Sequence, residues 1–179
     1  MIVTLEEAKQ ANEKITKLQL DALESFIRAE TNNSFHNKNI RFRNVEIEAP
    51  NIIRFNKIPI GLSKGNTIEV NYSSYNDDLY VIDEVAGNEV KIIRDDTEPL
   101  IDESNSKVMV TKVVYPLEVK QGILSILEYD LKMVDKLGLK SKTVARMSET
   151  YQDLTKSEVI GNRPAYLFSF LNNYYKYGG

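Results

Sequence analysis

The chain has 179 residues, of which 42% are hydrophobic and 27% charged, ordinary values for a globular protein with one core or two small ones. Cysteine is absent, which excludes disulfides, thiol nucleophiles and cysteine-ligated metals, and no apolar run is long enough to span a bilayer or to act as a secretion signal. The net charge of −3 disfavours a general nucleic-acid binder, and the negative charge lies mainly in the middle of the chain, because residues 116–179 carry a net +2.

The N-terminal residues predict a long helix. Thr4 and Glu7 have the spacing of a capping box, and neither proline nor glycine interrupts the chain before Pro50. An apolar stripe recurs at helical spacing, and the polar run from Thr31 to Ser34 ends the helix. The stripe consists of Ile15, Leu18, Ala22, Phe26 and Ala29.

Three further apolar residues, Leu20, Leu23 and Ile27, lie beside this stripe and widen it. A helix that is apolar over most of its circumference is either deep in a core or packed on two sides. In a chain this small, the second side can be another subunit. We therefore consider these three residues as candidates for a subunit interface, with a central core helix as the alternative.

The middle of the chain, residues 38–114, has the alternation of short β-strands. Ile40 and Phe42 alternate with arginines, Val45 and Ile47 with glutamates, and similar short runs follow up to Thr111. Turn residues such as Gly65, Gly87 and their polar neighbours separate the runs. We expect a small antiparallel β-barrel or sandwich, inserted between helices that occupy residues 1–37 and 115–179. The fold class is therefore α+β, with a small bundle of an N-terminal, a central and a C-terminal helix around the insert.

The loop that follows residue 94 carries a group of acidic side chains, namely Asp95, Asp96, Glu98, Asp102 and Glu103. Clustered carboxylates suit a hard cation such as calcium, but the spacing matches no EF-hand loop. A solvated hairpin tip is the ordinary explanation. We predict no metal and no cofactor.

Catalytic patterns are equally scarce. His36 is the only histidine, and no nucleophile-elbow sequence accompanies it. One imidazole makes neither a metal site nor a triad, so we interpret His36 as a lone surface histidine. We expect no enzyme.

Pro116 opens a second helical region that extends to Leu137, with Gly138 as its stop. Glu128 and Lys132 form an i,i+4 pair on its outer face. Residues 141–151 are rich in serine and threonine, which predicts an extended segment. A last helix then starts near Pro164, with an apolar face of Leu167, Phe170, Leu171 and Tyr174.

Several motifs in this order resemble those of the head–tail connector (head-completion or adaptor) proteins of long-tailed phages and prophages of Gram-positive bacteria. They are Tyr115-Pro116-x-x-Val119-Lys120-x-Gly122, Gly138-Leu139-Lys140-Ser141-x-Thr143-x-x-Arg146-x-Ser148-x-Thr150-Tyr151, and Gly161-x-Arg163-Pro164 before an aromatic end. The N-terminal helix ending at Thr31-Asn32-Asn33-x-Phe35 agrees, so the similarity spans most of the chain. The sequence departs from the family pattern after Tyr151, where Gln152-Asp153-Leu154 replaces a glycine-containing acidic turn.

The resemblance implies a structural virion protein, made in the host cytoplasm, that forms a homo-oligomeric, dodecameric ring at the head–tail interface. Such a ring binds the portal protein and a downstream stopper or tail-completion protein, and it extends the channel through which DNA passes without specific binding. Under this interpretation the acidic loop faces the channel. The portal-docking candidates are Arg163, Tyr174, Tyr175 and Tyr177, in a tail that orders on binding.

Two other classes stay open. One is a different tail-associated structural protein that uses the same β insert. The other is a nucleic-acid-binding module built on a small barrel, which a salt-dependent shift of DNA mobility would support. A hydrolase is a more distant third.

Overall fold

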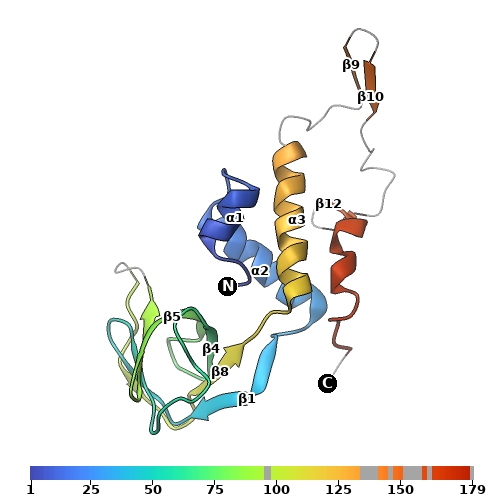
Figure 1. Ribbon diagram of the computed structural model, residues 1–179. Coiled ribbons are helices and arrows are strands. Elements are labelled where there is room, and N and C mark those ends of the chain that lie inside the picture. Colours follow the sequence, from blue (N-terminus) through green and yellow to red (C-terminus); the bar gives the residue numbers. More distant parts are fainter. Residues whose placement is uncertain (95–97, 134–140, 145–146, 151–158, 161–162, 178–179) are drawn as a thin grey trace. The chain divides into compact units, whose positions relative to one another are not determined.

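The structure is a computed structural model of an α+β protein (Figure 1), and it describes residues 1–94, 98–133, 141–144, 147–150, 159–160 and 163–177. The chain divides into two compact units. We call Met1 with Ser34–Val114 the β unit, and Ile2–Asn33 with Tyr115–Gly179 the helical unit. The expected insert began at residue 38, but strand pairing begins at His36, where the polar side chains hid the strand pattern.

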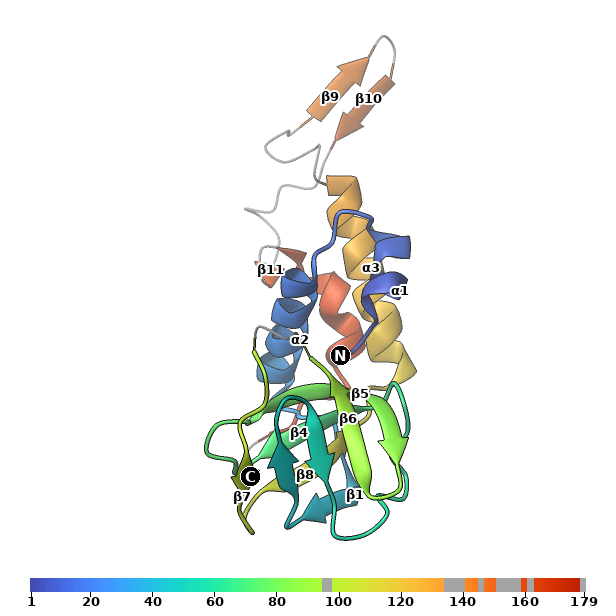
Figure 2. The ribbon, with the colours of Figure 1, turned by 90° about the vertical axis from the view of Figure 1, so that its left-hand side faces the viewer.

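The β unit contains an eight-stranded antiparallel sheet with the order β1-β8-β4-β5-β6-β3-β2-β7 (Figure 2). The strands are β1 (His36–Arg43), β2 (Glu46–Glu48), β3 (Ile52–Arg54), β4 (Thr67–Asn71), β5 (Asp78–Ala86), β6 (Glu89–Ile93), β7 (Glu103–Ser104) and β8 (Met109–Val113). We expected a small barrel or sandwich, and the barrel is wrong, because the two edge strands β1 and β7 do not pair with each other. β7 has only two residues, which is too short to continue the ladder around a barrel.

Alternation along the strands builds the core of this unit. Ile68 and Val70 of β4 and Ile82 of β5 are fully buried, and the ring of Phe42 meets that of Phe55 edge-on with centroids 5.1 Å apart. Each fully buried side chain of this kind contributes about 1.5–3 kcal/mol. The sheet is therefore a rigid support for the loops at its ends.

The two ends of the insert lie next to each other. β1 pairs with β8, so that His36 faces Val113, and the Val114 N–H donates to the Phe35 carbonyl at 2.9 Å. The chain thus leaves the helical unit and returns to it at neighbouring points of the sheet.

The helical unit begins with two helices, α1 (Leu5–Ala11) and α2 (Lys17–Thr31), where we expected one long helix. The capping box at Thr4 and Glu7 is confirmed. A second capping box, formed by Thr16 and Gln19, restarts the helix. Asn12 ends α1 in an extended conformation, and its side-chain amide donates to the Leu127 carbonyl at 3.3 Å. Because these side chains satisfy the helix ends, the chain can break without glycine or proline.

The break changes which face of α2 is buried. Leu20, Leu23 and Ile27 are 4%, 6% and 0% exposed, whereas Leu18, which we placed on the core stripe, is 77% exposed. The three interface candidates are therefore core residues of this chain and offer little surface to a second subunit. α2 ends at Asn32 in the left-handed conformation, with φ of 48°.

The second part of the helical unit contains α3 (Leu117–Met133) and the short 3-10 helix η2 (Ala165–Leu171). Both α1 and η2 pack against α3. The predicted Glu128–Lys132 pair is confirmed, with 3.8 Å between the charged atoms. The predicted stop at Gly138 lies outside the described residues.

Extended segments follow α3, as expected for residues 141–151. β9 (Ser141–Val144) and β10 (Met147–Thr150) pair as an antiparallel hairpin. β11 (Val159–Ile160) pairs with β12 (Arg163–Pro164) just before η2. η2 is a 3-10 helix and buries Phe168 and Leu171. Of the apolar face that we predicted, Leu171 is buried, whereas Leu167, Phe170 and Tyr174 are half-buried.

Candidate interaction surface

The acidic loop is only partly described, since Asp95 and Asp96 lie outside the described residues. Glu98 is exposed, and its carbonyl accepts a hydrogen bond from Arg94. The carboxylate of Asp102 accepts the Ala49 N–H at 2.7 Å. Glu103 accepts hydrogen bonds from Ser73 and Ser74 in the loop that follows β4. Two of the five acidic side chains, those of Asp102 and Glu103, thus accept hydrogen bonds from other residues of the β unit.

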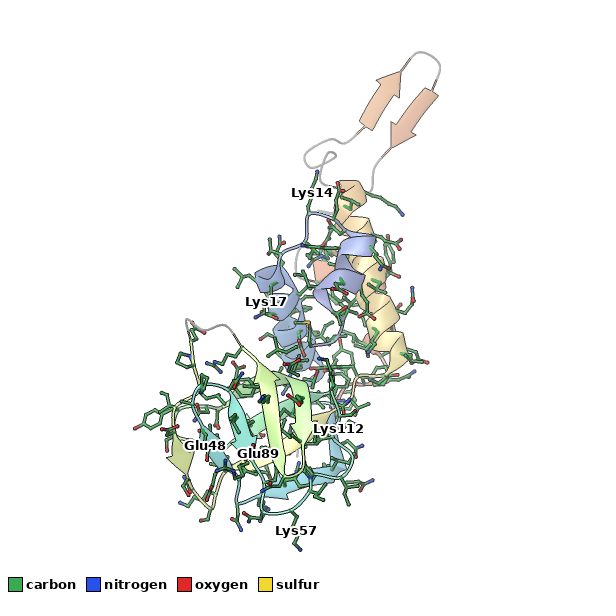
Figure 3. The ribbon with its side chains drawn as sticks, turned by 60° about the vertical axis from the view of Figure 1, so that its left-hand side comes forward. Lys14, Lys17, Glu48, Lys57, Glu89 and Lys112 are labelled. Carbon is green, nitrogen blue, oxygen red and sulfur yellow. The ribbon has the colours of Figure 1, made fainter. Side chains whose placement is uncertain are left out.

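An open hollow of about 620 Å³ lies beside β2 and β7 and is lined by Glu46, Ile47, Glu48, Ala49, Asp102, Glu103 and Ser104. Three of its four carboxylates, those of Glu48, Asp102 and Glu103, have partners within the β unit. Arg54 of β3 pairs with Glu48 of β2 and with Glu89 of β6, at 2.8 Å from Glu89, and Figure 3 shows these two glutamates close together. Among the described residues, no group of three His, Asp or Glu side chains could hold a metal ion. The hollow therefore has no arrangement suited to metal chemistry.

His36 is not the lone surface histidine that we predicted. Its Nε2 lies 2.6 Å from Oε2 of Glu69, and both side chains are mostly buried, at 17% and 15% exposed. The pair joins β1 to β4, which lie on either side of β8 in the sheet. Glu69 therefore gives the imidazole a structural role in the sheet.

The loop between β4 and β5, residues 72–77, is held unusually tightly. Glu103 accepts from the Ser73 and Ser74 hydroxyls and from the Ser74 N–H, the last at 3.0 Å. The Asn76 side chain donates to the Ile101 carbonyl at 3.0 Å and accepts from the Ile101 N–H at 2.9 Å. These bonds fasten the loop to residues 101–103.

Hydrogen bonding sets the charge state of Glu103. Burial acts to raise the pKa of this carboxyl, but the hydrogen bonds from Ser73, Ser74 and Asn105 outweigh it and hold the pKa below its usual range. Glu103 is thus an ionised acceptor under ordinary conditions. Asp77 adds two more bonds, because its carboxylate accepts the N–H groups of Tyr72 and Ser73.

This rigid loop exposes large side chains. Tyr72, Tyr75 and Ile101 are 65%, 71% and 50% exposed, and we call them the tyrosine surface. Tyr72 has a φ of 64°, a conformation that non-glycine residues hold only where the surroundings enforce it. Tyrosine is enriched at protein interfaces. A preorganised loop with two exposed tyrosines is therefore suited to binding.

A second exposed apolar segment lies in the loop between β3 and β4. Lys57, Ile58 and Ile60, here called the isoleucine loop, are exposed, and the two isoleucines are 67% and 82% accessible. The intervening Pro59 is buried. Figure 3 shows Lys57 pointing away from the β unit.

The predicted portal-docking residues are mostly engaged within the helical unit. Arg163 makes two hydrogen bonds to Asp130, at 2.8 and 2.7 Å. The Tyr174 hydroxyl donates to Glu118 at 2.6 Å, and that of Tyr175 donates to Glu30 at 3.2 Å.

The chain end is also tied down, because the Lys176 N–H donates to the Thr31 carbonyl at 2.8 Å. Tyr177, at 92% exposure, is the member of the docking set that stays fully accessible. The described tail is thus already packed, whereas we expected one that orders on binding.

Sequence reasoning missed both exposed segments of the β unit. Tyr72 continues the apolar alternation of Ile68 and Val70, a pattern that is typical of an inward side chain. The exposure of Tyr75 could have been predicted, since it is an aromatic residue within a polar turn, Ser73-Ser74-Tyr75-Asn76-Asp77. Ile58 and Ile60 flank a proline and formed no strand pattern.

Comparison with known proteins found no matching family model, no similar curated protein and no similar solved structure. Within the described part of the chain, no helix is both long and apolar enough to cross a membrane.

Proposed function

We propose that this chain is a structural assembly protein, and specifically a ring adaptor between the portal and the tail or stopper proteins of a long-tailed phage or prophage. In this role it is a small helical bundle with a β insert, it works at the head–tail interface of the virion, and it does no covalent chemistry. The ordered set of motifs around α3 and η2, from Tyr115 to Pro164, supports the connector assignment.

One structural observation carries the broader assembly role. The acidic groups beside β7 bind backbone and side-chain donors of their own unit, while large apolar side chains project from well-anchored loops. Reactive sites require the opposite arrangement, with poised polar groups in a sheltered pocket. Exposed tyrosine and isoleucine on a rigid frame favour protein binding.

Nucleic-acid binding is the weaker alternative. The hollow beside β7 is lined by four carboxylate side chains, of Glu46, Glu48, Asp102 and Glu103, and these repel phosphates. A channel wall that lets DNA slide benefits from such repulsion. A DNA mobility shift that weakens with added salt would favour the alternative.

The test is to mix the chain with the portal protein of the same genome and to measure the mass by light scattering. We expect a discrete ring-sized complex. A chain that stays monomeric and does not bind its portal would overturn the connector assignment.

The structure also improves the test of the docking tail. Deleting all residues after Tyr166 would remove the buried Phe168 and Leu171 and so damage the fold. Tyr177→Ser changes an exposed side chain and is expected to weaken portal binding, with Tyr166→Ser as the matched exposed-tyrosine control.

A further inference from the structure

We propose that the β unit of one copy of this chain binds the β unit of the next copy head to tail, with the isoleucine loop of one copy on the tyrosine surface of its neighbour. The inference rests on the proposed function, because it supplies the contact between unlike faces that a ring adaptor needs.

The two surfaces lie at opposite ends of the same strand. Lys112 of β8 is the register partner of Ile68 and donates to the Gly61 carbonyl, which places the isoleucine loop near the first residues of β4. Tyr72, by contrast, directly follows Asn71, the last of the five residues of this strand. A strand of this length spans roughly 16 Å. Because the surfaces lie near opposite ends of β4, a contact between them requires two copies of the chain.

Hydrogen bonds within the loop, and contacts with β1 and β8, hold the isoleucine loop in place. The Ile60 N–H donates to the Ile58 carbonyl at 2.9 Å, and the Leu62 N–H donates to the Pro59 carbonyl at 3.1 Å. Lys112 donates to the Gly61 carbonyl at 2.7 Å, and the Ile40 side chain packs closely against Gly61. The two isoleucines are therefore held in position before binding, which reduces the entropy lost on association.

The charges of the two surfaces are complementary. The tyrosine surface has four carboxylates near it, those of Asp77, Asp78, Asp102 and Glu103, against three cations at the same end of the sheet, Arg43, Arg94 and Lys107, which leaves a small acidic excess. The isoleucine loop carries one cation of its own, the exposed Lys57, which directly precedes Ile58 in the chain. Lys64, in the same β3–β4 loop as the isoleucines, pairs with Asp83 at 2.9 Å, so its charge is partly neutralised. Opposite charges around two apolar centres set the orientation of the contact.

These features define what kind of partner the tyrosine surface can bind. The tyrosine surface needs a partner with exposed aliphatic side chains beside a cation, and the isoleucine loop of this chain is such a partner. A contact between unlike faces repeats from copy to copy and closes into a ring when the rotation permits.

Two surface substitutions test the proposal. Ile60→Asp disables the isoleucine loop, and Tyr75→Asp disables the tyrosine surface. Each variant alone is expected to lose self-association by about thirtyfold or more, because each places a charge at the centre of the contact. Sedimentation velocity of the full chain, over a concentration series, measures the loss.

Mixing the two variants gives the decisive result. Ile60→Asp keeps an intact tyrosine surface and Tyr75→Asp keeps an intact isoleucine loop, so an equimolar mixture is expected to form a 1:1 dimer that cannot grow. A mixture that stays monomeric would overturn the proposal, as would a parent chain that is monomeric at its highest attainable concentration. Misfolded variants could not restore a dimer, so the mixture also checks the fold.

Leu18→Asp is the matched control, because Leu18 is an equally exposed aliphatic residue of the helical unit. It is expected to assemble like the parent chain. Unchanged assembly of Ile60→Asp and Tyr75→Asp would instead place the self-contact elsewhere and overturn this inference.

Portal binding, measured on the same proteins, separates the two proposals. A parent chain that binds its portal while both variants assemble normally would retain the connector role and remove this contact. A parent chain that assembles through these surfaces but does not bind a portal would retain the contact and remove the connector role.

Discussion

Gly122 lies inside α3 at the point where the ring of Phe170 from η2 comes closest. A Cβ atom at this position would lie 2.3 Å from Cδ1 of Phe170, which is closer than any van der Waals contact permits. Glycine within a helix ordinarily costs about 1 kcal/mol relative to alanine. The close approach of Phe170 explains why glycine is nevertheless suited to this position.

We therefore expect Gly122→Ala to lower the free energy of unfolding by about 1–2 kcal/mol, because the displaced ring costs more than the helix gains. Urea unfolding followed by circular dichroism measures the change. The control is Ser125→Ala on the exposed face of α3, which should be neutral or slightly stabilising. In a Phe170→Ala background the cost of Gly122→Ala should disappear, and an unchanged cost would contradict the steric explanation.

Tyr115 connects the start of α3 to α2 through a buried hydrogen bond. Its hydroxyl donates to Oε1 of Glu24 at 2.7 Å, and both residues are buried. Burial, followed by the nearby Glu24 carboxylate, raises the pKa of Tyr115 well above its usual value of 10.0, although Arg28 partly opposes this. Tyr115→Phe is expected to cost about 1–3 kcal/mol, because the buried Glu24 carboxylate loses this hydrogen bond.

The raised pKa of Tyr115 also predicts an alkaline effect. Above pH 10.0 the unfolded chain releases the phenolic proton while the folded chain retains it, so stability falls as the pH rises. Thermal melting from about pH 9 to about pH 11 should show a smaller decline for Tyr115→Phe than for the parent chain. Equal declines would show that Tyr115 does not titrate differently on unfolding.

Single residues also show where sequence reasoning succeeds. The capping box at Thr4 and the pair of Glu128 with Lys132 depend only on local spacing, and both are confirmed. The closeness of His36 to Glu69 depends on the order of strands in the sheet. No local pattern contains that information, so the histidine was misread.

Among the elements, α2 shows how one missed break affects the assignment of a whole face. Treating residues 4–31 as one helix kept Ile15 and Leu18 in phase, and this placed the apolar stripe on the wrong side of α2. The capping box at Thr16 starts a new helix with its own phase. Leu20, Leu23 and Ile27 then face the core, which removes them as interface residues.

The loop between β4 and β5 is an element whose order depends on Glu103. Glu103→Ala is expected to speed amide exchange at Ser74 by about tenfold or more, because a hydrogen bond to a charged acceptor contributes about 1.5–3 kcal/mol. It should also weaken self-association by loosening the tyrosine surface. The control is Glu98→Ala, which removes the same charge from an exposed site that does not bind the loop.

The lowered pKa of Glu103 gives this loop an acid sensitivity. The ionised Glu103 carboxylate stabilises the loop fully above the usual pKa of 4.5. This stabilisation is lost as the pH falls through the lower pKa that Glu103 has in the folded protein. Exchange at Ser74 should therefore rise in acid for the parent chain, after correction for the intrinsic rate, and not for Glu103→Ala. A pH-independent difference between the two proteins would contradict this role for the carboxylate.

At the scale of the whole molecule, the order of helix, β insert and helix could be predicted, because periodicity changes from helical to alternating near β1 and back near α3. The open sheet could not be predicted, since closure depends on the length of β7, a two-residue strand without a pattern of its own. The tyrosine surface also depends on tertiary structure. It exists because Glu103 and Asn76 join two loops that are about 25 residues apart in sequence.

The adjacency of the insert's ends allows a test of the two-unit organisation. Phe35 and Val114 are joined by a backbone hydrogen bond of 2.9 Å, so a short glycine linker can replace residues 34–114 without stretching the chain. We expect the remaining helical unit to keep its helical circular dichroism and to unfold cooperatively, because Ile27, Leu127 and Phe168 give it buried side chains of its own. The excised β unit, residues 34–114, is expected to fold as well, around Ile68, Val70 and their neighbours.

Portal binding gives this deletion a functional result. If the helical unit carries portal docking and the β unit carries the self-contact, the deleted chain should bind a portal while losing self-association in solution. Light scattering of the deleted chain, alone and with portal, measures both properties. The matched control is the full chain carrying Ile60→Asp, which should behave in the same way while keeping its β unit. A deleted chain that still self-associates would assign the contact between copies to the helical unit, and an unfolded one would show that the helical core depends on the insert.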